Sequence, residues 1–492
     1  MNRIRSWSAI ALGAIGLTLL AGEAAGAPVR ALFSTIQSHP SSLVPGGGGA
    51  RFRQTADAFL RPYAAPIGKR WVIKAHTTDS ASSNEVIIAG NGISAIRALK
   101  KGDASPIAGA SYGYFGSACG VDGAGNVVAS SFLEGAPAGT NASVVRVFGG
   151  TPTIFACAGA SAPGLNDPTG PTGDELFGAN FDSAGMTPGG IPFFRNDNIV
   201  NVNSSCRSAV FFGTNPIAQQ GVSYPGVHFD SFTCTLSSHF QTTGTTWIVD
   251  GDIDATSGIQ EAVVVNGAVL CQVGEPAFGF VPDVEEIDGI DLVSDAWFVR
   301  GRNQDGVCWA VRNNVLLGVS FLPIVSGSTE HFQGRFLWAT GSGSGSYVVC
   351  CGTDQPDLAR NQVVVLNRNT VVARTGDPVD LDHNGVFDDD VYIRSFLEHS
   401  AAMTGHGMLV FAASLRSGSG QDLGSALLRA RLFCVGDVNL DGIVGIGDVG
   451  VMISHWNTSV STGTFGDVNE DGQVNLADLA FVIQNWAENC NE

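Results

Sequence analysis

The sequence predicts a mainly β protein, with a β-propeller of about seven small blades followed by a small all-α calcium-binding module. Three observations lead to this prediction. Glycine accounts for 64 of the 492 residues and only 14% of residues are charged, which favours strands and tight turns over charged helices. An apolar strand followed by a hairpin recurs along most of the chain. The C-terminal part is acidic and carries two loops of calcium-binding spacing.

Residues 1–27 are expected to be a secretory signal peptide. Arg3 and Arg5 give a basic start, residues 9–21 are apolar, and residues 24–27 offer small side chains for cleavage. A membrane anchor is the alternative, but this apolar run is too short to cross a bilayer comfortably, and no later run is long enough. We therefore expect a secreted protein, extracellular or at the cell surface, with no membrane span after signal removal.

Residues 28–432 are expected to form the repeated β domain. Each repeat has a hairpin that ends in Gly and then Pro, and the Asn266-Gly267 turn is the strongest hairpin signal. An apolar strand precedes each hairpin and a final one follows them all. These strands lie at residues 71–75, 127–132, 191–194, 247–249, 297–299, 347–351, 408–412 and 426–432.

Radial repetition of small sheets protects their edges, so the repeats favour a β-propeller. A β-sandwich and a β-solenoid are the alternatives, because the spacing of the repeats is irregular. In a propeller, the unpaired strand at residues 31–36 would complete the last blade and close the ring. Pairing of this strand with its sequence neighbour alone would exclude that closure.

Residues 433–492 contain no Lys or Arg, and their acidic residues follow a repeated pattern. Numbered from the first Asp, each segment has oxygen-bearing side chains at positions 1, 3, 5 and 12 and Gly at position 6, the pattern of a twelve-residue calcium loop. The predicted side-chain ligands are Asp437, Asn439, Asp441 and Asp448 in the first loop, and Asp467, Asn469, Asp471 and Asp478 in the second.

The remaining ligand positions differ between the two loops. Position 7 needs only a backbone carbonyl, which Ile443 and Gln473 supply. At position 9, Asn475 offers an oxygen but Gly445 has no side chain. We therefore expect the second site to bind Ca²⁺ more tightly.

Each loop leads into a helix with one apolar face, and the two faces are expected to pack on each other. The matched positions are Val449, Met452, Ile453 and Trp456 in the first helix, and Leu479, Val482, Ile483 and Trp486 in the second. No helix-like stretch precedes either loop, so each half is a loop plus one helix rather than a full EF-hand.

Two such halves, each closing with Asp at position 12, resemble the dockerin type I module. The resemblance covers residues 435–486 and implies Ca²⁺-dependent folding and docking onto a cohesin-type scaffold protein or another cell-surface component. In that family the module often attaches a polysaccharide-active enzyme, so a polysaccharide is a further implied partner. Cohesin-binding dockerins commonly carry small hydroxyl residues at positions 10 and 11, whereas this sequence has Ile446, Gly447, Leu476 and Ala477.

Cys434 and Cys490 flank the two halves. Their ends lie close in an antiparallel pair, so a disulfide is geometrically reasonable, and two unpaired or differently paired thiols are the alternative. The ten cysteines are an even number, which suits an oxidising compartment.

A further acidic loop lies within the β domain. Asp380, Asp382 and Asn384 occupy positions 1, 3 and 5, and Asp388 takes position 9. Position 12 is Val391, so the closing carboxylate is missing. This loop is either a Ca²⁺ site or a solvated acidic turn, and the sequence does not decide between the two.

The sequence argues against nucleic-acid binding but does not decide between a binding or structural role and catalysis. A formal net charge of −19 without a basic cluster argues against nucleic acid as a partner. Asp250, Asp252, Glu285 and Asp295 are acids available for catalysis, but sequence spacing cannot pair them across blades. A non-catalytic binding or structural domain is the preferred interpretation. A polysaccharide-degrading O-glycosyl hydrolase or lyase is the alternative.

Overall fold

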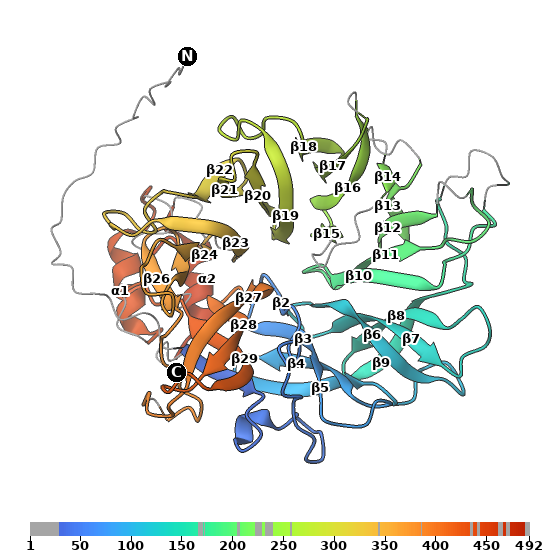
Figure 1. The fold of residues 1–492 in the computed structure, drawn as a ribbon, viewed down its shortest axis with the longest axis horizontal. Helices are drawn as coiled ribbons and strands as arrows, with labels where there is room; N and C mark the ends of the chain where they lie inside the picture. The colour runs from blue at the N-terminus through green and yellow to red at the C-terminus, as the bar shows by residue number, and fades with distance from the viewer. Residues whose placement is uncertain are drawn as a thin grey trace.

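The computed structural model describes residues 29–487, apart from residues 166–170, 172, 204–206, 222–228, 232–239, 256–257, 343–344, 385, 433–435, 440–442, 461–465 and 469–472. Strands make up 52% of it, and those of the described residues form seven sheets in a ring (Figure 1). The predicted β-propeller is therefore confirmed, with seven blades. The β-sandwich and β-solenoid alternatives are wrong.

The blades follow one another along the chain, and each is built of antiparallel neighbours. Blades one to three consist of β2 (Tyr63–Ala64), β3 (Arg70–His76), β4 (Glu85–Asn91) and β5 (Ser94–Lys100); β6 (Ser111–Val121), β7 (Val127–Glu134), β8 (Ala142–Phe148) and β9 (Thr151–Cys157); and β10 (Asn180–Met186), β11 (Pro192–Asp197), β12 (Ser208–Phe212) and β13 (Asn215–Gln219).

Blades four and five consist of β14 (Phe229–Ser231), β15 (Phe240–Thr242), β16 (Trp247–Ala255), β17 (Gly258–Val265) and β18 (Ala268–Gln272); and β19 (Val284–Val293), β20 (Ala296–Asn303), β21 (Cys308–Arg312) and β22 (Val315–Val319). Blades six and seven consist of β23 (Phe332–Gly341), β24 (Tyr347–Thr353), β25 (Gln362–Leu366) and β26 (Thr370–Arg374); and β27 (Tyr392–Met403), β28 (Met408–Arg416), β29 (Asp422–Arg431) and β1 (Val29–Ser34). A 3₁₀ helix, η1 (Pro40–Ser42), follows β1.

The strands expected from apolar runs are the middle strands of the blades, from β3 to β28. Their residues alternate between two interfaces, since a separate apolar cluster fills the gap on each side of a blade. In β24, for example, Cys350 belongs to the cluster shared with blade seven and Cys351 to the one shared with blade five. Burial on both faces explains why these strands are continuous apolar runs.

The N-terminal strand closes the ring. β1 pairs antiparallel with β29, with Val29 opposite Ala430 and Ser34 opposite Ala426. The prediction that this segment completes the last blade is confirmed. The side chain of Phe33 then packs into the cluster between blades seven and one, where its ring centroid lies 5.0 Å from that of Phe52 and 6.2 Å from that of Trp71.

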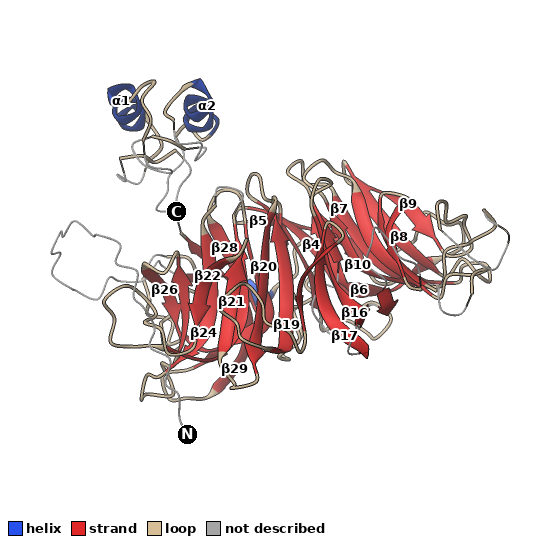
Figure 2. Ribbon diagram, turned by 90° about the horizontal axis from the view of Figure 1, so that it is seen from above, coloured by secondary structure: helices blue, strands red, loops and turns tan. Residues whose placement is uncertain are grey.

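Two short helices lie apart from the sheets (Figure 2). They are α1 (Ile446–Ser454) and α2 (Leu476–Gln484), and both begin inside the predicted loops. Met452 and Val482 are buried between them, together with Val444 and Val474 from the loops.

The predicted helix packing is wrong for part of each apolar face. The side chains of Ile453, Ile483 and Trp486 are 65%, 59% and 49% exposed. Loop valines occupy the centre of this small core, so the helices bury only a narrow strip of each face.

The cysteines of the described residues are free thiols, and there are six of them. The predicted Cys434–Cys490 disulfide and the predicted signal peptide both lie outside the described residues. Within the described part of the chain, no helix is long and apolar enough to cross a membrane.

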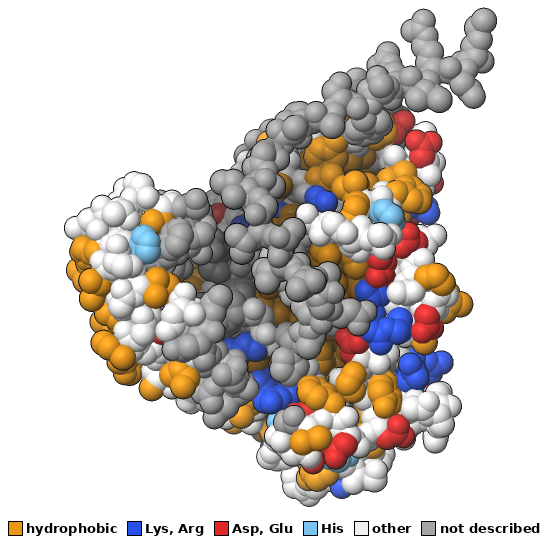
Figure 3. All heavy atoms as spheres, turned by 90° about the vertical axis from the view of Figure 1, so that its left-hand side faces the viewer, with side chains coloured by type: hydrophobic (Ala, Val, Ile, Leu, Met, Phe, Trp, Pro, Cys, Tyr) orange, Lys and Arg blue, Asp and Glu red, His pale blue; other side chains and the backbone are white. Residues whose placement is uncertain are grey.

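Basic and acidic side chains are interspersed on the face of the molecule shown in Figure 3. No continuous basic patch lies among the described residues that this view shows.

Candidate functional sites

The first acidic loop folds around the carboxylate of Asp448. This residue is fully buried. Its Oδ1 accepts hydrogen bonds from the backbone N–H groups of Val438 and Asn439 at 2.6 and 3.0 Å, and its Oδ2 accepts one from Gly445 at 2.7 Å. The residue predicted for position 12 therefore reaches back to the start of the loop, as a closing calcium ligand must.

The second loop repeats this geometry around Asp478, which is also fully buried. Its Oδ1 accepts a hydrogen bond from Val468 N–H at 2.8 Å, and its Oδ2 accepts one from Asn475 N–H at 2.9 Å. The Oδ1 atom of Asn475 accepts a bond from Ala477 N–H at 2.8 Å and so caps α2. Gly445 at the start of α1 has no side chain that could do this.

The residues present fit a calcium ion. Asp448, Asp467 and Asp478 are at least 97% buried, and residues 436–487 contain no Lys or Arg that could neutralise them. Burying a carboxylate without a counter-charge is costly, whereas Ca²⁺ takes several oxygen ligands. Of the other predicted ligands, Asp437, Asn439, Ile443, Gln473 and Asn475 are described, and Asp441, Asn469 and Asp471 lie outside the described residues.

The two halves hold each other in place. After α1, Asn457 N–H donates to the carbonyl of Val474 in the second loop at 2.8 Å, and after α2, Ala487 N–H donates to that of Val444 in the first loop at 2.8 Å. Gly466, at φ +102°, lies so close to α1 that an added Cβ would be 2.6 Å from Met452 Cγ. Loss of one loop should therefore weaken the other.

The third acidic loop brings three carboxylates together. Oxygens of Asp380, Asp382 and Asp389 lie within 4.8 Å of one another. Asp389 takes the place predicted for Asp388, because its Oδ2 accepts a bond from Leu381 N–H at 2.7 Å and folds the side chain back onto the loop.

Other groups already engage this loop. Arg30 in β1 forms an ion pair with Asp380 at 3.1 Å. The side-chain oxygen of Asn384 accepts a bond from Val386 N–H at 2.6 Å. Calcium binding by Asp380, Asp382, Asn384 and Asp388 stays a prediction, with Asp389 as the fourth carboxylate that the structure offers.

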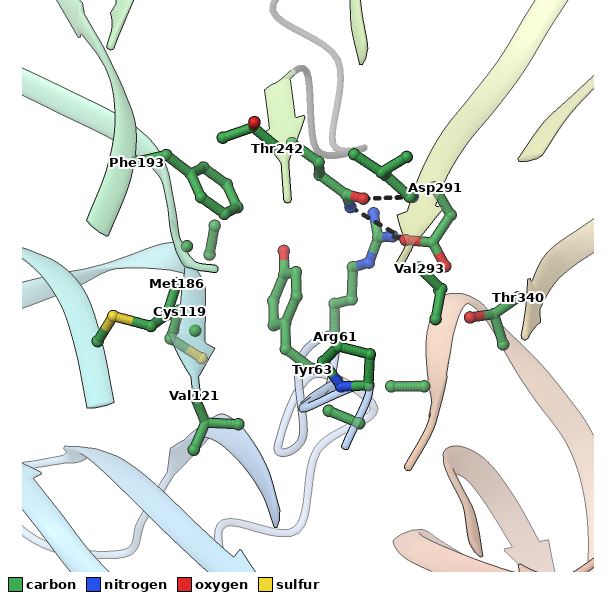
Figure 4. Close-up of a pocket in the computed structure, with 18 of the residues that line it drawn as sticks. Arg61, Tyr63, Cys119, Val121, Met186, Phe193, Thr242, Asp291, Val293 and Thr340 are labelled. Atoms are coloured by element: carbon green, nitrogen blue, oxygen red, sulfur yellow. Dashed lines mark hydrogen bonds and ion pairs between the residues drawn. The ribbon is translucent and has the colours of Figure 1, made fainter. Parts of the chain in front are cut away.

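A cavity of about 80 Å³ lies in the centre of the propeller. Residues on the innermost strands of every blade line it, from Tyr63 in β2 and Cys119 in β6 to Thr340 in β23 and Met403 in β27. The cavity is therefore the central channel of the ring (Figure 4).

A charged pair with a neighbouring amide forms one wall of the channel. Arg61 Nη2 lies 3.1 Å from Asp291 Oδ1, and Gln241 Nε2 donates to the same oxygen at 3.0 Å (Figure 4). The Arg61 guanidinium also lies 5.3 Å from the centre of the Tyr63 ring. Burial raises the pKa of Tyr63 to about 12, partly offset by the Arg61 charge, so the phenol is neutral at physiological pH.

The acids that the sequence offered for catalysis do not line this channel. Asp250 is buried within blade four, and Glu285 lies 3.5 Å from Arg302. Asp295 accepts hydrogen bonds from the hydroxyls of Thr243 and Thr245 at 2.8 and 2.9 Å, and these bonds lower its pKa.

Asp252 lies directly opposite Glu261 in the β16–β17 pair. The pKa of Glu261 is raised from 4.5 to about 7, first by burial and then by the charges of Asp250 and Asp252. Sequence spacing did not single out this carboxyl.

The helical segment can now be assigned. Residues 435–486 match the family of the dockerin type I domain. This segment is a dockerin type I domain. As a class, dockerin type I domains bind calcium and attach to cohesin-type partners, and the proteins that carry them are typically extracellular.

Beyond the dockerin, the comparisons support no assignment. No curated protein matches the chain significantly. The β-propeller domain of the Trilobed protease from Pyrococcus furiosus is 6% identical, with 74% of this chain and 91% of that chain covered and a TM-score of 0.37. Trypanosoma rangeli sialidase is 11% identical, with 89% and 64% covered and a TM-score of 0.31. At such low scores we draw no argument from these similarities.

The dockerin exposes apolar side chains in matched pairs. Ile446 and Leu476, at position 10 of the two halves, are 77% and 71% exposed, and Ile453 and Ile483 are also exposed. These four residues, which we call the dockerin apolar pairs, are the first and eighth residues of α1 and α2.

Proposed function

We propose that the chain is a secreted protein whose dockerin, folded around one calcium ion in each loop, attaches a non-catalytic binding propeller to an extracellular cohesin-type scaffold or cell-surface component. The observation that carries the calcium part is the burial of Asp448 and Asp478, both fully enclosed in a segment without Lys or Arg. Calcium would supply the missing counter-charge and hold each loop closed.

Calcium titration tests the ligand assignment. Replacing Asp467 and Asp471 together by Asn should remove one ion from the calorimetric stoichiometry and loosen α2, because binding energy is folding energy in such modules. Glu470→Gln is the matched control, since it removes a charge at position 4, which is not a ligand position. An unchanged stoichiometry in the double variant would refute the second site.

The dockerin apolar pairs support the docking part of the proposal. Two of them, Ile446 and Leu476, are large apolar residues at position 10, where hydroxyl-bearing residues are common. A partner should therefore recognise this dockerin mainly by burying Ile446 and Leu476. Burial of an exposed apolar side chain contributes about 1.5–3 kcal/mol. A charge at these positions should prevent that burial.

Capture from the secreted proteins of the same organism tests the docking. The protein should retain, in calcium and not in EDTA, a partner that mass spectrometry identifies as carrying a cohesin-type domain. Ile446→Asp combined with Leu476→Asp should abolish capture. Val315→Asp, at a propeller position that is 63% exposed, should not. Capture that survives EDTA or the double variant contradicts the proposal.

The channel supports binding rather than catalysis. A glycosidase of the usual kind needs two facing carboxylates, and Asp291 is the one carboxylate among the described residues that line the channel. Burial raises the pKa values of Tyr63 and Cys119 to about 12, so neither is a ready nucleophile at neutral pH. Turnover of any polysaccharide by the protein that Asp291→Asn abolished would favour the hydrolase or lyase alternative.

A further inference from the structure

The central channel has the size of a small ligand. Its volume of about 80 Å³ holds about six water molecules at roughly 10–15 Å³ of such volume each, and six waters occupy roughly 180 Å³ in the liquid. That is the volume of one six-membered sugar ring.

The charges in the channel favour an uncharged ligand. Arg61 and Asp291 neutralise each other at 3.1 Å, and their side chains are only 13% and 14% exposed. An anionic ligand would meet Asp291 and a cationic one would meet Arg61, each in a poorly solvated site where repulsion is strong. Neither charge therefore has a favourable place in the channel.

Polar groups without described partners point to a ligand that carries hydroxyls. Among the described residues, no partner is recorded for the hydroxyl of Tyr63, the Oδ2 atom of Asp291 or the hydroxyl of Thr340, whose side chain is 98% buried. In Figure 4 the Tyr63 hydroxyl points into the open centre, between Phe193 and Arg61. A ligand that carries hydroxyls can pair with these groups, whereas an apolar ligand would displace water from them without replacing its hydrogen bonds.

Apolar side chains also line the channel, some of them on the same strands as the polar ones. Met186 and Phe193 in blade three, Phe240 in blade four and Val293 in blade five line the channel. A purely apolar ligand would satisfy these walls but leave the polar groups unmatched, whereas a sugar ring has apolar C–H faces and a hydroxyl-bearing edge. The mixture of polar and apolar lining residues therefore suits a ligand that carries both kinds of surface.

We propose that the central channel binds a single neutral sugar ring, either as a free monosaccharide or as the terminal unit of a chain. Tyr63 and Thr340 would hydrogen-bond to its hydroxyls, Asp291 would accept from one of them, and Arg61 and Gln241 would hold Asp291 in place. This proposal rests on the binding role proposed above for the propeller and names the ligand class.

Calorimetric titration of the intact, calcium-loaded protein tests this. The probes are the methyl glycosides of glucose, galactose and mannose, a uronic acid, an amino sugar and a neutral oligosaccharide. At least one neutral glycoside should saturate the protein, and both charged sugars should bind at least tenfold more weakly. An oligosaccharide that binds as tightly as the glycoside indicates a chain end, and failure of the oligosaccharide alone indicates a free sugar.

Matched variants locate the site. Tyr63→Phe keeps the ring and removes one hydroxyl, so affinity should fall about tenfold, the effect of one lost hydrogen bond. Tyr114→Phe, at a 52% exposed tyrosine outside the channel, should have no effect. The proposal is overturned if no neutral sugar binds, if a charged sugar binds best, or if Tyr63→Phe binds normally.

The same protein sample can show whether the sugar proposal or the proposed docking through the dockerin has failed. Calcium-dependent capture of the cohesin-type partner needs no sugar. A protein that docks but binds no sugar overturns only the ligand assignment. A protein that binds sugar but captures no partner overturns only the tether.

Discussion

Gly445 and Asn475 occupy the same position in the two halves of the dockerin, and they differ in what they offer. Asn475 caps α2 through its side-chain oxygen, whereas Gly445 has no side chain to cap α1. Gly445 has an extended backbone, with φ −160°, which any residue adopts. The first loop can therefore accept the asparagine of the second without strain.

Gly445→Asn should tighten calcium binding at the first loop. The new side chain adds an oxygen at position 9 and improves the helix cap by a few tenths of a kcal/mol. Titration in a background of Asp467→Asn and Asp471→Asn isolates this loop. Gly447→Ala, which raises helix propensity without adding an oxygen, is the control. Equal affinities for Gly445→Asn and the control would contradict the role given to position 9.

Glu261 makes the stability of the propeller depend on pH. Its pKa is raised from 4.5 to about 7 in the folded protein. Between these values the unfolded chain has lost the proton and the folded chain has kept it, so stability falls as pH rises. Above about pH 7 the carboxyl is ionised in both states and the penalty is constant.

Glu261→Gln should remove that fall. At pH 8 the variant should melt at a higher temperature than the parent, because its free energy of unfolding should be larger by about 1 kcal/mol after solvent screening. The melting temperatures of the two proteins should converge near pH 4. Calorimetric melting between pH 4 and 8 measures this. Glu275→Gln, an exposed residue of the same blade, should keep the slope of the parent, and a shared slope in all three proteins would rule the effect out.

At the scale of elements, closure of the ring depends on the strand β1 and on its buried phenylalanine, Phe33. Phe33 is 91% buried and packs against Trp71 in β3 of the first blade and against Phe52 in the segment before that blade. It thereby joins the last blade to the first, in addition to the backbone ladder with β29.

Phe33→Ala should destabilise the propeller by about 3 kcal/mol, the cost of removing a buried aromatic ring. Urea unfolding followed by tryptophan fluorescence would measure the loss. Phe148→Ala, at a 60% exposed phenylalanine of β8, should cost little. If both variants unfold at the same urea concentration, β1 does not hold the ring closed through Phe33.

The middle strands could be predicted from sequence, whereas the innermost ones could not. The middle strands are buried on both faces and form long apolar runs. β6 and β27 are interrupted by register shifts, at Phe115/Cys119 and at Phe396/Ala401. Such bulges break the alternation on which strand prediction depends.

The candidate sites likewise include one kind that could be predicted from sequence and one kind that could not. The dockerin loops are local, with all ligands within twelve residues, so spacing alone revealed them. Arg61, Gln241 and Asp291 come from three different blades and have no common spacing. The expected packing of the two helix faces failed at Ile453 and Ile483, because apolar periodicity does not show that loop valines already fill the core.

At the scale of the whole molecule, the propeller and the dockerin have separate apolar cores. The propeller should therefore melt independently of calcium in the dockerin. EDTA should abolish the smaller calorimetric transition and leave the larger one in place. A single transition that shifts as a whole in EDTA would contradict this independence.

The acidic loop beside β1 gives this experiment a second use. If Asp380, Asp382 and Asp389 hold calcium, EDTA should also lower the melting temperature of the propeller, and Asp382→Asn should remove that response. If the loop is a solvated turn, the propeller transition should be the same with and without EDTA. Asp305→Asn, in an exposed propeller turn, is the control.

The pairing of β1 with β29 also affects how the protein is made. The hydrogen bond from Ser425 N–H to Thr35 Oγ1 joins residues 390 positions apart. At about 5–20 residues per second, a ribosome needs roughly 20 to 80 s to make the chain between them. During that interval the first strand has no partner, and the ring cannot close. Closure of the ring is therefore a late step of folding, and its timing depends on which strands are joined rather than on how apolar they are.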